Sequence, residues 1–287
     1  MRFAPSILAL FVGVLGFAAD SSAIERTAYV IDAYGDMTSG VLPTSPGSMQ
    51  LTTIADYDNR LVGSTMDSDG SLLTMFAETD ELVRINPATL EYQVLHTLAI
   101  DIVEFDDLVF GPTGDLLLLH GGFLSGSSSL YDIDTETGGL TLLAEFDKSF
   151  ISIEFHQGAY YAGNFPWQFF RIDPETFEAT LIREYDFLLN VAWGLASIGD
   201  SLWCGYTLSG GGGPPPHFYL PVIGVIDPET GDLTDQAFLG PTSDNYPYHQ
   251  TLEIVERVVP IPALGPTGIV ILVTLLGLAG TLAIRRL

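Results

Sequence analysis

The chain has 287 residues, with 36 Asp and Glu against 10 Lys and Arg, a formal net charge of −26, and one cysteine. So negative a chain repels phosphate backbones, which argues against nucleic-acid binding. One cysteine can form neither an internal disulfide nor a multi-cysteine metal site. A hydrophobic content of 47% is too high for a disordered chain.

The first 23 residues have the pattern of a secretory signal peptide. Arg2 supplies the charged start, an apolar run covers residues 7–18, and the small residues Ser21 and Ala23 fit positions −3 and −1 of a signal-peptidase site. We therefore expect signal peptidase to remove residues 1–23 and the rest of the chain to be exported. The alternative is a buried core helix.

A repeated phrase runs through residues 24–257. Each copy has an apolar strand, an Asp-Pro-x-Thr-like turn and a second strand, and a fainter copy is centred on Asp32. The clear copies lie 48, 39 and 54 residues apart and are anchored on Asn86, Asp134, Asp173 and Asp227. A repeat of this period indicates one supersecondary unit per copy.

A second phrase precedes each clear copy and consists of two apolar runs around a Gly-containing turn, which predicts a hairpin. In the repeated turn the Asp accepts backbone N–H groups and proline presets φ. Gly138 and Gly231 supply the residue with φ > 0. Where Leu90 or Phe177 stands instead, we expect a strained residue or a different turn. The flanking runs alternate with period two, so each unit contains about four strands.

These units predict an all-β fold, a β-propeller of about five four-stranded blades. Four units are complete, at about residues 60–99, 104–147, 150–185 and 192–240. We expect the N-terminal strand near Asp32 and a strand at about residues 249–257 to share the fifth blade and close the ring, which hides the sheet faces and edges. Four blades with a disordered edge, or a sandwich, are the alternatives. The turn pattern resembles that of extracellular bacterial β-propellers, a resemblance that implies fold and not function.

Carboxylates are the candidate ligands of the propeller axis. Asp106 and Asp107 precede or begin a predicted innermost strand, and Glu154 has a similar place in the third unit, so these three could hold a cation. A solvated rim is the alternative. Residues 67–70 begin like a calcium loop but lack its downstream glutamate, so we interpret them as a turn, with structural calcium as the alternative. The five histidines occupy unequal positions in their units, which argues against a histidine-metal site.

Nucleophilic catalysis has no support in the sequence. There is no G-x-S-x-G motif, P-loop or G-x-G-x-x-G motif. Cys204 lies in a predicted strand, where a packed and inert thiol is expected. We predict no catalytic residues and no cofactor, apart from the calcium ion that is the alternative interpretation of residues 67–70.

The C-terminal residues 258–287 have the pattern of a membrane-sorting tail. Residues 258–284 carry no charge, residues 268–284 are just long enough for one transmembrane helix, and two arginines follow. The tail resembles the IPTL-CTERM sorting signals, relatives of the PEP-CTERM signals of Gram-negative bacteria, although Ala263 and the stretch 265–267 depart from their pattern. The residues that carry the resemblance are Val259, Pro260, Ile261, Pro262, Leu264, Gly268, Arg285 and Arg286.

This resemblance implies an address. A sorting protease of the exosortase type would remove the helix after transient anchoring in the inner membrane, and the product would reach the cell surface or the medium. Without its two end segments the body keeps 7 basic and 35 acidic residues, a net charge of −28. We expect a non-catalytic binding or scaffold propeller with an unidentified surface ligand. The alternatives are a propeller-type hydrolase or lyase that uses a cation held by the channel carboxylates, and a passive matrix component.

Overall fold

The computed structural model describes residues 22–32, 36–44, 46–103, 106–121, 126–164, 168–185, 189–210, 218–239 and 249–260. Contacts group Arg26–Glu256 into one compact unit and the two terminal segments into another. All elements of the described residues are strands, which confirms the predicted all-β class. None of the described residues belongs to a helix with the length and apolar character of a membrane span.

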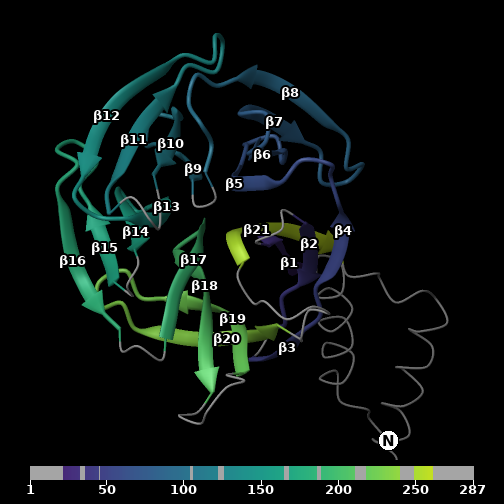
Figure 1. Cartoon of the computed structure of the whole chain (residues 1–287). Coiled ribbons are helices and arrows are strands. Elements are labelled where there is room, and N and C mark those ends of the chain that lie inside the picture. The colour runs from purple at the N-terminus through teal and green to yellow at the C-terminus, as the bar shows by residue number, and fades with distance from the viewer. Residues whose placement is uncertain are drawn as a thin grey trace, which may run out of the picture. The chain divides into compact units, whose positions relative to one another are not determined.

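The strands form five sheets arranged around an axis, with one inner strand from each sheet nearest the centre, and four of the sheets are entirely antiparallel (Figure 1). The first three blades each consist of four consecutive strands. Blade 1 contains β5 (Leu61–Met66), β6 (Leu72–Phe76), β7 (Glu81–Ile85) and β8 (Tyr92–Thr97). Blade 2 contains β9 (Asp107–Phe110), β10 (Leu116–His120), β11 (Ser128–Ile133) and β12 (Leu140–Phe146). Blade 3 contains β13 (Phe150–His156), β14 (Ala159–Asn164), β15 (Gln168–Ile172) and β16 (Ala179–Glu184).

Blade 4 has five strands, one more than the sequence predicts. It contains β17 (Leu189–Ile198), β18 (Ser201–Gly210), β19 (Phe218–Ile226), β20 (Leu233–Leu239) and β3 (Gly47–Met49). The short strand β3 pairs in parallel with β20. Its residue Met49 is buried in the core between blade 4 and the closing blade, which explains why this segment leaves its neighbours in the chain.

The closing blade joins the two ends of the repeat region, as predicted. Its strand order is β21 (His249–Pro260), β1 (Ser22–Asp32), β2 (Met37–Val41) and β4 (Thr52–Ala55). The inner strand therefore comes from the C-terminal side of the chain and the three outer strands from the N-terminal side. This arrangement rules out the alternatives of an open edge and a sandwich.

Five apolar clusters hold the ring together, one at each contact between blades. Between blades 2 and 3, for example, Val109 and Leu117 pack with Phe150 and Phe170. Between the closing blade and blade 1, Ile31 packs with the residues of β6 around Phe76. Each sheet is thus apolar on both faces, and each face is covered by a neighbouring blade. Burial of this kind is the main stabilising term of the fold.

The repeated turn also links neighbouring blades. In the turn of blade 4 the hydroxyl of Tyr185, from blade 3, donates to the carbonyl of Gly231 over 2.7 Å. In blade 1 the hydroxyl of Tyr57, from the closing blade, donates to the carbonyl of Leu90 over 3.1 Å. Leu90 and Phe177 keep the turn with φ of 61° and 55°. Of the two expectations for these positions, a strained residue is therefore the one observed, and a different turn is not.

Gly138 is expected to be the most sensitive of these turn positions. An added Cβ would lie 2.7 Å from Cβ of His96 in the neighbouring blade, at a φ of +75°. We expect Gly138→Ala to lower the free energy of unfolding by about 2–4 kcal/mol, from backbone strain plus overpacking. Gly114→Ala is the matched control, because φ is +87° there but nothing lies within 4 Å. It should cost only about 1–2 kcal/mol, and equal losses in urea titrations of the two variants would contradict the inter-blade contact.

The predicted processing segments lie mostly outside the described residues. Ser22 and Ala23 belong to the start of β1, and Val259 and Pro260 belong to the end of β21. The remaining residues of the signal peptide and the sorting motif, Ile261, Pro262, Leu264, Gly268, Arg285 and Arg286, lie outside, so their roles stay predictions.

Candidate functional site

Three carboxylates, two of them buried and the third (Glu154) half-buried, meet near the propeller axis. Asp107 begins β9 of blade 2, Glu154 lies in β13 of blade 3, and Glu253 lies in β21 of the closing blade. All three strands are the inner strands of their sheets (Figure 1). We call Asp107, Glu154 and Glu253 the axial trio. The sequence predicted two members of it, and the third comes from the blade that closes the ring.

Asp107 ties its own blade to both neighbours. One carboxylate oxygen accepts the N–H of Ile153, in blade 3, over 3.0 Å. The other accepts the N–H of Leu108 over 3.0 Å and that of Ser64, in blade 1, over 3.4 Å. The residue is 4% exposed. Inner strands have one edge without a strand partner, so a side-chain acceptor there satisfies buried N–H groups.

Glu154 and Glu253 repeat this arrangement around the axis. The carboxylate of Glu154 accepts the backbone N–H of Ser197 from blade 4. The carboxylate of Glu253 accepts the N–H of Met66 from blade 1, and the Ser64 hydroxyl lies 3.4 Å from its Oε1. Each member therefore accepts a backbone N–H of the next blade. Ser64 contacts two members and links them.

Burial shifts the trio toward the protonated form. Desolvation raises the pKa of Asp107 to about 7, although its three backbone hydrogen bonds oppose the shift. Desolvation, and then the charge of Asp107, raises the pKa of Glu154 well above its ordinary value. For Glu253, desolvation again raises the pKa, followed by the charges of Glu154 and Asp107. Three carboxyl groups that are close together and largely desolvated therefore favour bound protons over three charges.

Asp106, the third carboxylate that the sequence singled out, makes a different set of contacts. Its Oδ2 lies 3.0 Å from Nδ1 of His120 and accepts the N–H of Val103 over 2.9 Å. Its Oδ1 accepts the N–H of Gly121. The hydrogen bond that His120 donates to the Asp106 carboxylate raises the pKa of His120, against the opposing effect of desolvation. Asp106 thus fixes the backbone just before β9, at Val103, and just after β10, at Gly121.

The other chemistry-bearing residues are dispersed. His156 Nδ1 lies 2.8 Å from the hydroxyl of Ser197, and the thiol of Cys204 is buried. Residues 67–70 form a tight turn, in which the N–H of Gly70 donates to the carbonyl of Asp67, as predicted. Across the described ranges, no group of three or more His, Cys, Asp or Glu side chains is arranged to hold a metal ion.

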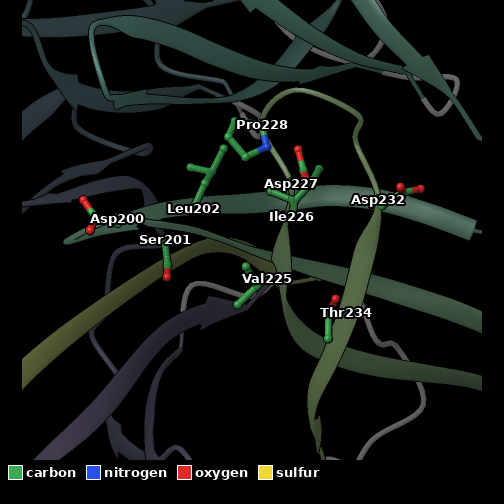
Figure 2. A pocket seen from close by; sticks show the side chains of 9 residues that line it. All are labelled: Asp200, Ser201, Leu202, Val225, Ile226, Asp227, Pro228, Asp232 and Thr234. Carbon is green, nitrogen blue, oxygen red and sulfur yellow. The ribbon is translucent and has the colours of Figure 1, made fainter.

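A groove of about 340 Å³ lies at one end of blade 4. Its lining side chains project from opposite sides of the sheet, with Ser201 and Val225 on one side and Leu202 and Asp227 on the other (Figure 2). Asp227 accepts the N–H groups of Glu229 and Thr230 within its own turn. The groove lies across the ends of β18, β19 and β20 and does not gather polar groups around one point.

Sequence reasoning missed Glu253 and His120. Glu253 could have been found by aligning the closing strand with β9 and β13, since all three are inner strands and each carries a carboxylate. No such signal exists for His120, because its contact with Asp106 depends on the hairpin register between β9 and β10.

Comparisons with known proteins give fold-level likeness alone. No family model matches the sequence, and no curated protein matches it. A solved nidogen/laminin complex contains a chain with 10% identity and a TM-score of 0.49, covering 81% of this chain and 98% of that one. An oligogalacturonate lyase in complex with manganese has 13% identity and a TM-score of 0.41, covering 76% and 68%. A virginiamycin B lyase from Staphylococcus aureus has 11% identity and a TM-score of 0.38, covering 71% and 78%.

Proposed function

We propose that this chain is an exported, surface-sorted β-propeller with a non-catalytic role, as a binding or scaffold module of the cell envelope or extracellular matrix. The observation that carries the non-catalytic part is the use of Asp107, whose two carboxylate oxygens both accept backbone N–H groups, two of them from neighbouring blades. The repeated turns likewise use their polar groups within and between blades. The polar residues that attract attention in the sequence thus contribute to ring assembly.

The proposed export and surface sorting rest on the two ends of the sequence. Signal peptidase would act after Ala23, and a sorting protease of the exosortase type would act near Val259–Gly268, before the apolar residues and the terminal arginines. Until that cleavage the C-terminal helix would anchor the chain in the inner membrane. The surface ligand stays unidentified, and the strong negative charge of the body argues against nucleic acid.

Intact mass of the protein isolated from its producing cells tests the address. We expect a mass that lacks residues 1–23 and the C-terminal apolar segment. A chain that retains both Met1 and Leu287 would overturn export and sorting together. A chain that lacks only the N-terminal segment would support export and overturn removal of the tail.

A hydrolase or lyase with a cation in the channel is the second candidate. It rests on the sequence expectation that channel carboxylates hold a cation, since hard cations such as calcium prefer several carboxylate oxygens, although within the described residues no group of three or more acidic, histidine or cysteine side chains is arranged to hold one. Metal analysis of the purified protein, together with thermal melts with and without EDTA, separates the two proposals. Stoichiometric metal and a lower melting temperature in EDTA would favour the enzyme. A metal-free protein whose melt is unchanged by EDTA would remove it.

A further inference from the structure

The axial trio lies at the place where the ring is closed. Glu253 belongs to β21, which covers residues 249–260. The other three strands of its sheet come from the N-terminal side of the chain. Around Glu253 lie Asp107 of blade 2, Glu154 of blade 3 and Ser64 of blade 1. We propose that protons shared by the axial trio lock the closing strand into the ring, and that the strand is released as the pH rises.

The groups that face Glu253 from the surrounding strands are mainly acidic. β9 contributes Asp107, and Asp106 just before it pairs with His120. β13 contributes Glu154. Neither β5 nor β17 has an ionisable side chain anywhere in its sequence.

Two basic groups on strands that border the axial trio have other partners. On β1, the neighbour of β21, Arg26 forms an ion pair with Glu256 over 2.7 Å and covers the ring of Trp203. His156, at the end of β13, has its Nδ1 at the Ser197 hydroxyl, and burial lowers its pKa. Proton binding is therefore the available way to limit repulsion within the trio.

The direction of the pH effect follows from the raised pKa values. A carboxyl whose pKa is higher in the folded than in the unfolded chain contributes stability that is fully present below its unfolded pKa and is lost as pH rises through its folded pKa. Unfolded Asp and Glu titrate near pH 4, and the pKa of Asp107 is about 7 in the ring. The window of lost stability therefore opens above pH 4 and extends through pH 7.

The closing strand is the element most easily released. In each of the other blades the inner strand continues through a short turn into its sheet partner, as β5 does into β6 and β13 into β14. β21 has no such covalent hairpin, because its sheet partner β1 lies at the other end of the chain. Repulsion at Glu253 thus acts on a strand held in place only by pairing and packing.

The test measures the unfolding equilibrium constant of the wild-type protein and of the Glu253→Gln variant. Both are used as the full chain in mild detergent, from pH 5 to pH 8.5, in EDTA and 0.5 M NaCl. Each proton held only by the folded state raises the unfolding equilibrium constant about tenfold per pH unit. We expect the wild-type constant to rise with pH more steeply than that of Glu253→Gln, by about tenfold per unit within the window. Hydrogen exchange should show the amides of β21 losing protection before those of β6 and β14.

Glu256→Gln is the matched control, with the same substitution on the same strand at an exposed position. The variant loses the ion pair with Arg26 and should be less stable at every pH, but it should retain the wild-type pH slope, since general surface repulsion affects all variants alike. Parallel slopes for wild type and Glu253→Gln would overturn the proposal, and so would protection lost evenly in all blades. If Glu253→Gln fails to fold, Glu154→Gln replaces it, with the same expected loss of slope.

Discussion

Asp107→Ala is expected to lower the free energy of unfolding by about 2–5 kcal/mol at pH 6. The substitution removes the acceptor of the N–H groups of Ile153 and Ser64 at a residue that is only 4% exposed. A buried donor that loses its partner costs about 1–3 kcal/mol. Because these donors belong to two other blades, the loss should appear as weaker assembly of the whole ring in urea or thermal unfolding.

Asp107→Asn is the control that separates shape and acceptor from charge. Asparagine keeps one carbonyl oxygen in nearly the same position, so it should lose less than half as much stability as alanine. A cation ligand would behave differently, since alanine and asparagine would both empty the site and EDTA would remove the difference between wild type and either variant. Equal losses for the two variants would therefore contradict the role of Asp107 as an acceptor between blades.

The strands of the ring were predictable because each has a local signal. Period-two alternation and turns such as the one at Asp134 mark four complete units. The closing blade was predictable from what was missing, a first half near Asp32 and a second half near residues 249–257. A ring of sheets that are apolar on both faces has no stable open form, so two incomplete ends imply a shared blade.

The parts that the sequence could not predict depend on distant contacts. β3 is three residues long and pairs in parallel with β20, and only the burial of Met49 explains its place. Phe177 keeps its left-handed conformation because its ring packs in the core between blades 2 and 3, a gain that offsets the backbone strain.

The same limit applies to the axis of the propeller. The sequence places Asp107 and Glu154 on inner strands, but whether such side chains accept backbone hydrogen bonds or point into water depends on the inclination of neighbouring blades. In the structure Asp107 accepts such a hydrogen bond, since the backbone nitrogen of Ile153 lies 3.0 Å from its Oδ2. Glu253 joins them only once the two ends of the chain are paired.

Removal of the closing strand is expected to have the largest effect of all. A chain that ends at residue 248 lacks β21, which leaves the edge of β1 unpaired and the core against blade 4 without Leu252 and Ile254. Each of these side chains contributes about 1.5–3 kcal/mol by burial, and lost strand pairing adds to this. The sum is comparable with the entire stability of a typical domain, about 5–15 kcal/mol.

We therefore expect the chain that ends at residue 248 to lose its cooperative thermal transition and to associate through its open edge, as measured by circular dichroism and size-exclusion chromatography. A chain that ends at residue 260 is the control, because it lacks the sorting tail but keeps β21. A synthetic peptide of residues 249–260 should restore part of the transition, since the missing element is one strand with its own two contact faces. If the two truncated chains melt alike, the ring does not depend on its closing strand. The proposal that protons shared by the axial trio hold β21 in the ring would then also be contradicted.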